Sequence, residues 1–534
     1  MASLLSHQPV ALISCYDKSG LDTLVPALVN TYGYQILSTG GTADYIRSLG
    51  LPVIETTELT GFKELAGGRV KSLHPTLFAG ILDPRDPEAS AESKPEFWID
   101  LVVANLYPFE AMKNAGKQEL IEYIDVGGPS LLRAAAKNHA WVTVLCQPSQ
   151  YAACLQELKL GEGETSLSYR KHLAGSVFSL TAAYDTCIAQ VFESAPNTEP
   201  TPTNLPSNLP STLPFTLHQC QPLRYGENPQ QAAALYSLNS NPNNETGFTL
   251  LQGKALSYNN LLDAFAAWNL IHEFDPDDQT ACAIIKHNNP CGVALGSTPL
   301  EAWERALSVD SLSAFGGIVA FNQPITASVA KGLTQLFLEV VMAPEVNEEA
   351  LAILSSKPNL RVLTRSWETP LAQWDIRVLD SERVLVQQAV SAPSLNTLNG
   401  DAGDETDQWQ VVTEAQPTPQ QWADIDLAWK VAKHVKSNGM ILAKNGRTVG
   451  LGMGQTSRIG ALEIALRQAC DDAQGSVLAS DGFIPALDNV HAALQGRVAV
   501  IVQPGGSVKD ADVIALANQH QLPMVTTGVR VFRH

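Results

Sequence analysis

The 534-residue chain is poor in cysteine and in positive charge. It has eight cysteines, and no two of them form a Cys-x-x-Cys pair. Disulfide-stabilised small folds and zinc ribbons need closely spaced cysteines, so both are excluded, and a reducing cytoplasm is the expected compartment. The 35 Lys and Arg residues stand against 54 Asp and Glu, for a formal net charge of −19. Nucleic acid and anionic membrane surfaces are therefore excluded as partners, and an anionic ligand must be held locally.

Long hydrophobic runs and a secretory signal are also missing. No apolar run approaches the roughly 20 residues that span a bilayer. No basic residue precedes Lys18, so the start lacks the charged region of a signal sequence. Hydrophobic residues still make up 45% of the chain, enough apolar surface for several buried cores. The sequence therefore predicts a soluble globular protein.

A proline-rich stretch divides the chain. Residues 194–214 repeat proline among Thr, Asn and Ser, which predicts a linker between a domain at 1–193 and a second at 215–534. In both domains, short apolar strands alternate with amphipathic helices, the pattern of an α/β fold. A polar stretch at 391–407 indicates that the second domain has two subdomains, with a boundary near 375–410.

A glycine turn in the first domain has the features of a phosphate site. Thr39, Gly40, Gly41 and Thr42 lie between a predicted strand and a predicted helix, where backbone N–H groups and the helix dipole favour an anion. An ordinary strand-to-helix turn needs the same residue types. The segment GGRVKSLHP at 67–75 adds cations without a nearby acid, although a solvated loop carries such charge harmlessly. Both interpretations remain open here.

The segment IDVGGPSLLRAAAKNHA predicts a helix that begins near Pro129. Arg133 and Lys137 lie four residues apart on one face, where like charges repel. Lys137 either stabilises the negative end of this helix or transfers a proton beside a bound phosphate.

The second domain has its own candidate in KHNNPCG, where Lys286 and His287 follow a predicted strand. A lone histidine is more often structural, but an adjacent lysine favours a neutral imidazole that can act as a base. A zinc deaminase is the competing idea, but Ala294 stands where its second cysteine is needed. The GLGMGQ segment at 450–455 lacks the glycine spacing of a dinucleotide fingerprint.

Longer motifs carry a family resemblance in both domains. GGRVKSLHP, NLYPFE and LLRAAAKNHA resemble the IMP cyclohydrolase domain of a bifunctional purine-biosynthesis enzyme family, whose fold is similar to methylglyoxal synthase. LRYGENPQQ, SYNNLLDA, KHNNPCG, SAFGGIVA, SNGMILAKNG, GMGQTSRI, DGFIPALDN and GVRVFRH resemble its transformylase domain. The resemblance implies a parallel-sheet domain followed by two cytidine-deaminase-like α/β units without a metal.

Two reactions follow from this resemblance. The first transfers a formyl group from 10-formyltetrahydrofolate to the amino group of aminoimidazole carboxamide ribonucleotide (AICAR), giving the formamido product (FAICAR). The second closes FAICAR to IMP with loss of water. Formyl transfer needs a base for a weakly nucleophilic amine and a charge for the oxyanion, and ring closure needs proton donors and acceptors.

For ring closure, the resemblance implies a reacting centre of Lys71, Tyr107, Asp125 and Lys137, with Lys137 as proton donor or acceptor. The rest of the nucleotide is assigned to Tyr16, Asp17, Lys18, Thr39, Gly40, Gly41, Thr42, Arg69, Val70, Ser72, Ala104, Asn105 and Val126. Tyr16 stands where a small hydroxyl residue is common in the family.

For formyl transfer, the resemblance implies His287 as the base and Lys286 as the oxyanion partner. The ribonucleotide is assigned to Arg224, Tyr225, Asn260, Gly316, Glu339, Asn438, Arg458 and Arg530, and the folate to Ile459, Phe483, Asp488, Ser507 and Val508. Core packing is the alternative for Phe483 and Ile459. Glu339 replaces an aspartate of some members, and residues 382–388 lack a family glycine pair, so no ligand role is expected there.

The resemblance also implies a homodimer with transformylase sites across the subunit interface, and it leaves a monovalent cation open. Two other classes remain as alternatives. One is a nucleotide-binding regulatory protein without catalysis, against which both sets of proton-transfer residues argue. The other is a methylglyoxal-synthase-like lyase fused to a deaminase, against which the missing zinc ligands argue.

Overall fold

The chain divides into two compact units, Met1–Thr216 and Leu217–His534. The computed structural model describes residues 8–62, 72–86, 88, 94–115, 120–193, 213, 217–238, 246–369, 371, 374–389 and 409–534. The predicted linker at 194–214, apart from residue 213, and the polar stretch at 391–407 lie outside the described residues.

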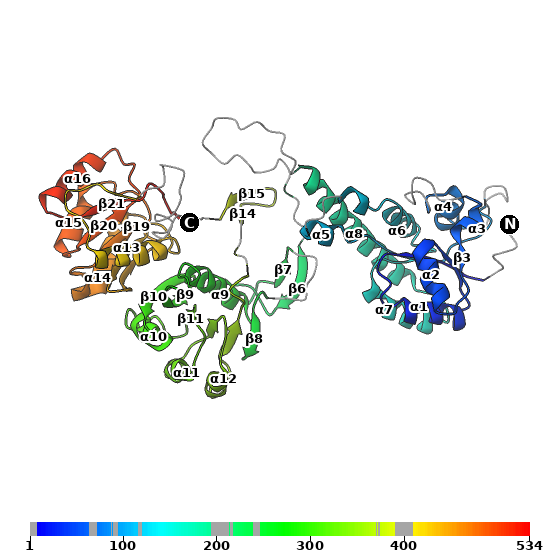
Figure 1. Cartoon of the computed structure of the whole chain (residues 1–534), viewed down its shortest axis with the longest axis horizontal. Coiled ribbons are helices and arrows are strands. Elements are labelled where there is room, and N and C mark those ends of the chain that lie inside the picture. Colours follow the sequence, from blue (N-terminus) through cyan, green and yellow to red (C-terminus); the bar gives the residue numbers. More distant parts are fainter. Residues whose placement is uncertain are drawn as a thin grey trace. The chain divides into compact units, whose positions relative to one another are not determined.

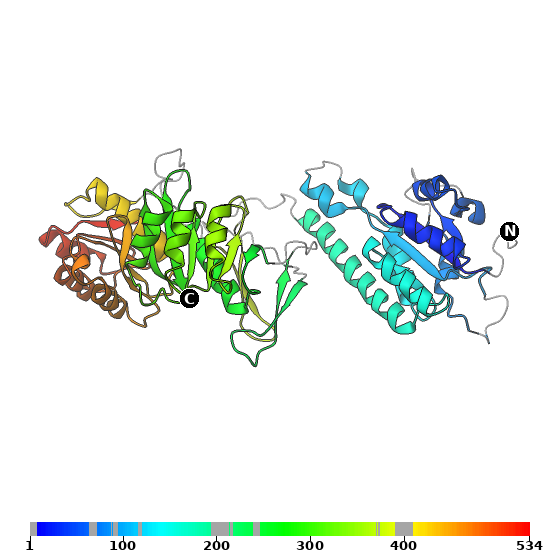
Figure 2. The same cartoon turned by 90° about the horizontal axis from the view of Figure 1, so that it is seen from below.

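The first unit is built on a parallel sheet whose described strands follow the order β3-β2-β1-β4-β5. The strands are β1 (Val10–Cys15), β2 (Gln35–Ser38), β3 (Ile54–Glu55), β4 (Leu101–Asn105) and β5 (Thr143–Leu145). The helices are α1 (Leu21–Asn30), α2 (Gly40–Ser48), α3 (Thr56–Thr60), α4 (Pro75–Leu82), α5 (Phe109–Asn114), α6 (Gly127–Lys137), α7 (Tyr151–Leu160) and α8 (Leu167–Glu193), with 3-10 turns at Leu120–Tyr123 and Pro148–Gln150. Figure 2 shows the long α8, in teal.

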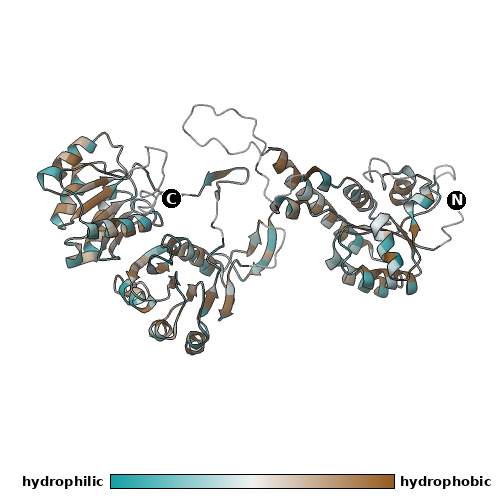
Figure 3. Cartoon of the chain, viewed as in Figure 1, coloured by the Kyte–Doolittle hydropathy of each residue, from teal (hydrophilic) through white to brown (hydrophobic). Residues whose placement is uncertain are grey.

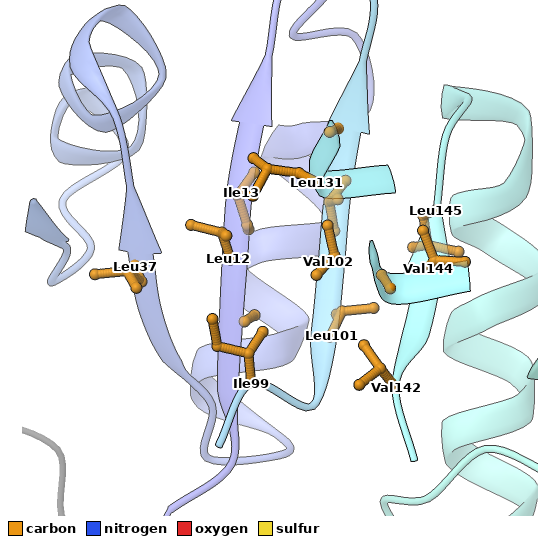
Figure 4. Close-up of a cluster of buried hydrophobic side chains, with 14 of the residues drawn as sticks. Leu12, Ile13, Leu37, Ile99, Leu101, Val102, Leu131, Val142, Val144 and Leu145 are labelled. Carbon is orange, nitrogen blue, oxygen red and sulfur yellow. The ribbon is translucent and has the colours of Figure 1, made fainter. Parts of the chain in front are cut away.

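Continuous apolar strands explain this sheet. VALISC in β1 and LVVAN in β4 are almost fully buried, as expected for parallel strands covered on both faces. Figure 4 shows their side chains packed with Leu131 of α6 and with Val144 and Leu145 of β5. The predicted parallel sheet of the first domain is confirmed.

The second unit contains, within its described part, a twelve-stranded sheet of order β16-β21-β20-β19-β17-β18-β10-β9-β11-β12-β13-β8. One half has β8 (Thr249–Gln252), α9 (Tyr258–Ile271), β9 (Thr280–Lys286), β10 (Asn289–Gly296), α10 (Pro299–Leu307), β11 (Ile318–Phe321), α11 (Ala327–Leu333), β12 (Val340–Ala343), α12 (Glu348–Leu354) and β13 (Arg361–Thr364). The other has β16 (Gln410–Val411), α13 (Pro419–Ala432), β17 (Met440–Lys444), β18 (Arg447–Gly452), α14 (Arg458–Ala469), β19 (Val477–Ser480), α15 (Leu487–Gln495), β20 (Val500–Gln503), α16 (Asp510–Gln519) and β21 (Met524–Thr526), with a 3-10 turn at Cys470–Ala473 (Figure 1).

The two halves are copies of one pattern, a helix, an antiparallel strand pair and three further strands joined by helices. Each sheet half is the mirror of the other in strand order, and they meet where β10 pairs with β18. Successive side chains of a strand point to opposite faces of the sheet, so one strand contributes to two cores. Ala283 and Ile285 of β9 pack in one core, and Cys282 and Ile284 pack in another. The helices α9 and α13 share the first core, whereas α10–α12 and α14–α16 cover separate ones.

The copies match in hydrogen bonds as well as in topology. The Nζ of Lys286 donates to the carbonyl of Phe315, and the Nζ of Lys444 donates to that of Gln474, each over 2.7 Å. Glycines 316 and 475 follow these carbonyls with φ of 72° and 77°. The two predicted subdomains are therefore internal duplicates, and Figure 3 shows hydrophobic strands in both.

Two hairpins stand outside the large sheets. The first pairs β6 (His218–Leu223) with β7 (Ala233–Ser237), and the second pairs β14 (Trp374–Val378) with β15 (Val384–Gln388). The second includes the 382–388 segment, for which a ligand role was not expected. Among the described helices, none is both long enough and apolar enough to cross a bilayer.

Candidate functional sites

The carboxyl edge of the first sheet carries the glycine turn predicted to bind phosphate. Thr39 is the N-cap of α2, but its hydroxyl lies 3.0 Å from that of Ser14 at the end of β1 and makes no cap hydrogen bond. The Thr42 hydroxyl bonds both the N–H and the carbonyl of Cys15. These side chains join the end of β1 to the N-terminus of α2, a helix end that favours an anion.

Asn105 organises the neighbouring loop. Its Oδ1 accepts the backbone N–H groups of Tyr16 (2.7 Å) and Asp17 (2.9 Å), and its Nδ2 donates to the carbonyl of Asp17. The rings of Tyr16 and Tyr107 meet edge to face with centroids 5.4 Å apart. Tyr16, Asp17, Asn105 and Tyr107 are thus brought together, and Lys18 follows them in the same loop with its Nζ 3.3 Å from the Tyr16 carbonyl.

Asp125 lies at the start of α6. Its Oδ1 accepts the N–H of Gly128 over 2.9 Å, and its own N–H donates to the hydroxyl of Tyr184. A Cβ on Gly127 would come within 2.7 Å of the Ser72 hydroxyl, so Ser72 and Asp125 flank the same helix turn. Val126, which follows Asp125 in the chain, is 57% exposed, and Ala104 is buried in β4.

Lys137 lies at the opposite end of this helix. It lies ten positions after Gly127 along α6, about 15 Å at 1.5 Å per residue. The next residue, Asn138, donates to carbonyls of Ile81 and Asp83 at the end of α4. The structure therefore does not bring Lys137 and Asp125 together within one chain. Arg69, Val70 and Lys71 lie outside the described residues.

A cavity of about 710 Å³ in the second unit contains the predicted ribonucleotide residues of its first part. Arg224, Tyr225, Asn260, His287, Gly316 and Glu339 all line it, together with Lys254, Asp263, Phe337 and Arg361, which the sequence reasoning missed. The cavity lies where β9 ends and where β11, β12 and β13 begin, so it uses the amino ends of these parallel strands.

Two arginines of this cavity each contact a neighbouring side chain. The Arg361 guanidinium bonds the Glu339 carboxylate over 2.7 Å, and the Arg224 guanidinium lies 4.7 Å from the centroid of the Tyr225 ring. The Glu339 carboxylate is therefore partly neutralised. Arg224 and Lys254 are cations of this cavity without a described carboxylate partner, which favours an anionic ligand.

His287 lies in a left-handed turn between β9 and β10, with φ of 53°, followed by Asn288 with φ of 60°. The Oδ1 of Asp263 in α9 accepts the N–H of Asn288 over 2.7 Å. Burial raises the pKa of Asp263, although hydrogen bonds from Asn288 and His287 oppose this. Asp263 and His287 also line a smaller adjoining cavity of about 300 Å³ with Glu227 and Asn259. Lys286 lines neither cavity, since its ammonium bonds Phe315.

A third cavity, about 420 Å³, lies in the second copy beside the ends of β18 and β19. Of the predicted residues it contains Asn438, Arg458, Ile459, Phe483 and Asp488, so nucleotide and folate candidates share one wall. Ser507, Val508 and Arg530 are not part of it. Val508 is 99% exposed, and the Arg530 guanidinium lies 4.6 Å from the ring centroid of Phe532, which does line the cavity.

Asp481 holds the buried end of Arg458. One guanidinium nitrogen of Arg458 lies 2.5 Å from Asp481 Oδ1, and another donates to Asn438 Oδ1 over 2.9 Å. The Asp481 side chain is fully buried, and the hydroxyl of Ser437 bonds its second oxygen. The sequence motif DGFIPALDN included Asp481, but an acid after a strand gives no hint of its partner.

No cluster of three or more potential metal ligands occurs among the residues that the structure describes. Cys291 is buried, which raises the pKa of its thiol to about 12.

The fold and these cavities define a two-part α/β enzyme. Residues 135–468 match the family model described as AICARFT/IMPCHase bienzyme, and residues 23–130 match the MGS-like domain. The bifunctional purine biosynthesis protein PurH of Gloeothece citriformis is 47% identical over 537 residues, which cover 98% of this chain and 99% of that protein. The protein of the same name from Rippkaea orientalis is also 47% identical, with 98% and 99% covered. A crystal structure of ForH is 34% identical and covers 35% of this chain and 97% of its own, with a TM-score of 0.31.

The chain belongs to the AICARFT/IMPCHase bienzyme family. It is a bifunctional enzyme of purine biosynthesis, with AICAR formyltransferase and IMP cyclohydrolase activities, and a folate is its one-carbon cosubstrate. These comparisons favour catalysis over a purely regulatory nucleotide-binding role.

Proposed function

We propose that the 710 Å³ cavity binds AICAR and that His287 takes the proton from its amino group. The amine nitrogen attacks the formyl carbon of 10-formyltetrahydrofolate, and the bond from that carbon to N10 breaks. The proton then passes from the imidazolium to N10, so tetrahydrofolate leaves neutral at this atom. The position of His287 beside Arg224, Asn260 and Gly316 in one cavity carries this proposal.

Lys286 is proposed to support the oxyanion of the tetrahedral intermediate. Its ammonium donates to Phe315 in the free chain, so it must leave this carbonyl, or act through the charge, when substrate binds. Lys444 and Gln474 make the same hydrogen bond in the second copy, which indicates that the contact also has a structural role. We expect Lys286→Met to lower kcat for formyl transfer, and Lys444→Met, the matched control, to affect stability alone.

The 420 Å³ cavity is proposed to hold the folate beside the nucleotide. Phe483 is 39% exposed and offers a ring face for a pterin, with Ile459 and Asp488 on the same wall. Ser507 and Val508 are proposed to contact the folate from outside this cavity, and Arg458, Asn438 and Arg530 the nucleotide. The test is Phe483→Ala: KM for the folate should rise more than KM for AICAR, and an equal change in both would contradict the assignment.

Ring closure is assigned to the carboxyl edge of the first sheet. Thr39 to Thr42, Lys18 and Asn105 are proposed to hold the phosphate and ribose, and Asp125 and Tyr107 to face the reacting ring with Lys71. Ala104, Val126, Arg69, Val70 and Ser72 complete the proposed wall. With FAICAR supplied directly, Asp125→Asn should lose cyclohydrolase activity while formyl transfer continues; loss of both activities would contradict separate sites.

We propose that the enzyme is a homodimer. Lys137 lies about 15 Å along α6 from the turn of Asp125, so we propose that it serves the ring held by another copy. The two transformylase cavities likewise share no lining residue. Light scattering should give about twice the 57.4 kDa of one chain. A monomer that retains both activities would contradict this assembly.

The direct test of the base is His287→Ala. Formyl transfer should be lost while AICAR still binds, because the cavity cations remain. The matched control is Asn445→Ala, which occupies the equivalent left-handed turn of the second copy, with φ also 53°. If Asn445→Ala removes formyl transfer to the same degree, the loss reports turn geometry and not a base.

A further inference from the structure

In each copy, the helix before the antiparallel strand pair carries one aspartate. Its carboxylate accepts hydrogen bonds from the backbone of the turn between the two strands. In the first copy, Asp263 of α9 accepts the N–H of Asn288 over 2.7 Å. In the second, Asp424 of α13 accepts the N–H groups of Asn445 (2.9 Å) and Gly446 (2.6 Å). Each aspartate lies six residues beyond the capping residue of its helix, Ser257 or Thr418.

The turns bound by these aspartates have the same backbone conformation. His287 and Asn288 have φ of 53° and 60°, and Asn445 and Gly446 have φ of 53° and 72°. Left-handed backbone is unfavourable for a histidine, by roughly 1 kcal/mol or more, so a fixed acceptor is needed to hold it. This hydrogen bond between aspartate and turn is therefore part of the duplicated fold. It is also present in the second copy, whose turn has no proposed catalytic group.

The surroundings of the two aspartates differ. Asp424 is 3% exposed, and neither it nor Asn445 lines a described cavity. Asp263 lines the 710 Å³ cavity and the adjoining 300 Å³ cavity, and His287 lines both beside it. The charge of His287 lowers the pKa of the Asp263 carboxyl group, as the smallest of the effects that act on it. In the first copy, Asp263 therefore fixes the turn of His287, the proposed base, which must gain and lose a proton.

We propose that Asp263 is a positioning residue for formyl transfer, which holds His287 against the substrate cavity and stabilises the imidazolium formed when His287 accepts the amine proton. Asp263 thus both holds the turn and stabilises the charge of His287, whereas Asp424 only holds its turn. This inference rests on the proposed role of His287 as the base.

The experiment compares Asp263→Asn with Asp424→Asn in the full-length enzyme. Asparagine keeps an acceptor oxygen for the turn but removes the charge. We expect Asp263→Asn to lower kcat for formyl transfer about 10-fold or more, with KM for AICAR changed less than about 3-fold and cyclohydrolase activity with FAICAR unchanged. Asp424→Asn should lower the thermal midpoint and leave kcat unchanged. Asp263→Glu, which keeps the charge, should retain more kcat than Asp263→Asn.

Several results would overturn the proposal: an unchanged kcat in Asp263→Asn, an equal loss of kcat in Asp424→Asn, or a greater loss in Asp263→Glu than in Asp263→Asn. If Asp263→Asn does not fold, Asp263→Ala and Asp424→Ala, which also remove the charge, are compared in the same way. Retention of formyl transfer by His287→Ala would instead refute the base itself, so the two failures are distinguishable.

Discussion

Arg458 depends on one buried carboxylate for its position at the cavity of the second copy. Its guanidinium is 7% exposed and the partner Asp481 is fully buried. Replacing Asp481 by asparagine leaves a buried cation without its counter-charge, which costs about 3 kcal/mol. We expect Asp481→Asn to lower the free energy of unfolding by this amount and to raise KM for AICAR, as measured by denaturant titration and by initial rates.

The Glu463→Gln variant on the same helix, α14, serves as control, because this residue is exposed. An unchanged stability and KM in Asp481→Asn would show that Arg458 does not need the pair.

At this scale, sequence reasoning located many site residues but not their partners. KHNNPCG gave His287, yet Asp263 lies 24 positions earlier in a helix, and only the fold brings its carboxylate to the turn. Arg361 and Asp481 were missed for the same reason. The family motif groups Lys137 with Asp125, but α6 places the two about 15 Å apart along its axis.

At the scale of elements, two glycines set how closely helices approach the central strand pair. A Cβ on Gly292 of β10 would lie 2.1 Å from the carbonyl oxygen of Ala306, and one on Gly450 of β18 would lie 2.2 Å from that of Ala465. Alanine at either position must push α10 or α14 away from its strand. We expect each substitution to cost about 2–3 kcal/mol of unfolding free energy. Gly175→Ala in α8, with no atom near its Cβ, should be neutral or stabilising; a similar loss there would contradict the argument.

A partly buried ion cluster joins the helices of the two copies. Glu273, just after α9, bonds Lys433 and His434, just after α13, each over 2.9 Å. Burial alone would raise the pKa of Glu273, but hydrogen bonds and charges from His434 and Lys433 outweigh it and lower the pKa to about 2. The folded-state pKa lies below the unfolded value, so this stabilisation is complete above about pH 4.5 and is lost as the pH falls towards 2.

We therefore expect Glu273→Gln to lower unfolding free energy by about 2–3 kcal/mol at pH 7, with the difference from wild type shrinking between about pH 4.5 and pH 2. Urea titrations across this range measure it. A difference that does not depend on pH would show that packing, not charge, accounts for the loss.

Strand and helix alternation predicted the α/β class of both units, because burial on both faces leaves a strong apolar pattern. The duplication was not visible as a sequence repeat. It appears in strand order and in paired bonds such as those of Lys286 and Lys444, since few side chains are shared between the copies.

At the scale of the whole molecule, the charge distribution suits an acidic protein that binds anionic substrates. The net charge is −19, yet the 710 Å³ cavity gathers Lys254, Arg224 and Arg361. Local cations overcome the overall repulsion over the short distances at which screening is weak.

Mixing two inactive variants tests the proposed interface-spanning transformylase site. His287→Ala and Arg458→Ala impair different cavities. If each site combines cavities from two copies, a mixed dimer contains one intact site, and random mixing restores about a quarter of wild-type formyl transfer. Each variant incubated alone in the same way is the control. No restored activity, in a mixture shown to exchange subunits, would place both cavities in one chain.

The central claim is that one chain performs both steps at separate centres, and one coupled assay tests it. Purified enzyme receives AICAR and 10-formyltetrahydrofolate, and tetrahydrofolate, FAICAR and IMP are followed together, with His287→Ala and Lys137→Ala beside the wild type. The account predicts tetrahydrofolate and IMP from wild type, neither from His287→Ala, and tetrahydrofolate with accumulated FAICAR from Lys137→Ala. Binding of AICAR by wild type without any product would contradict it.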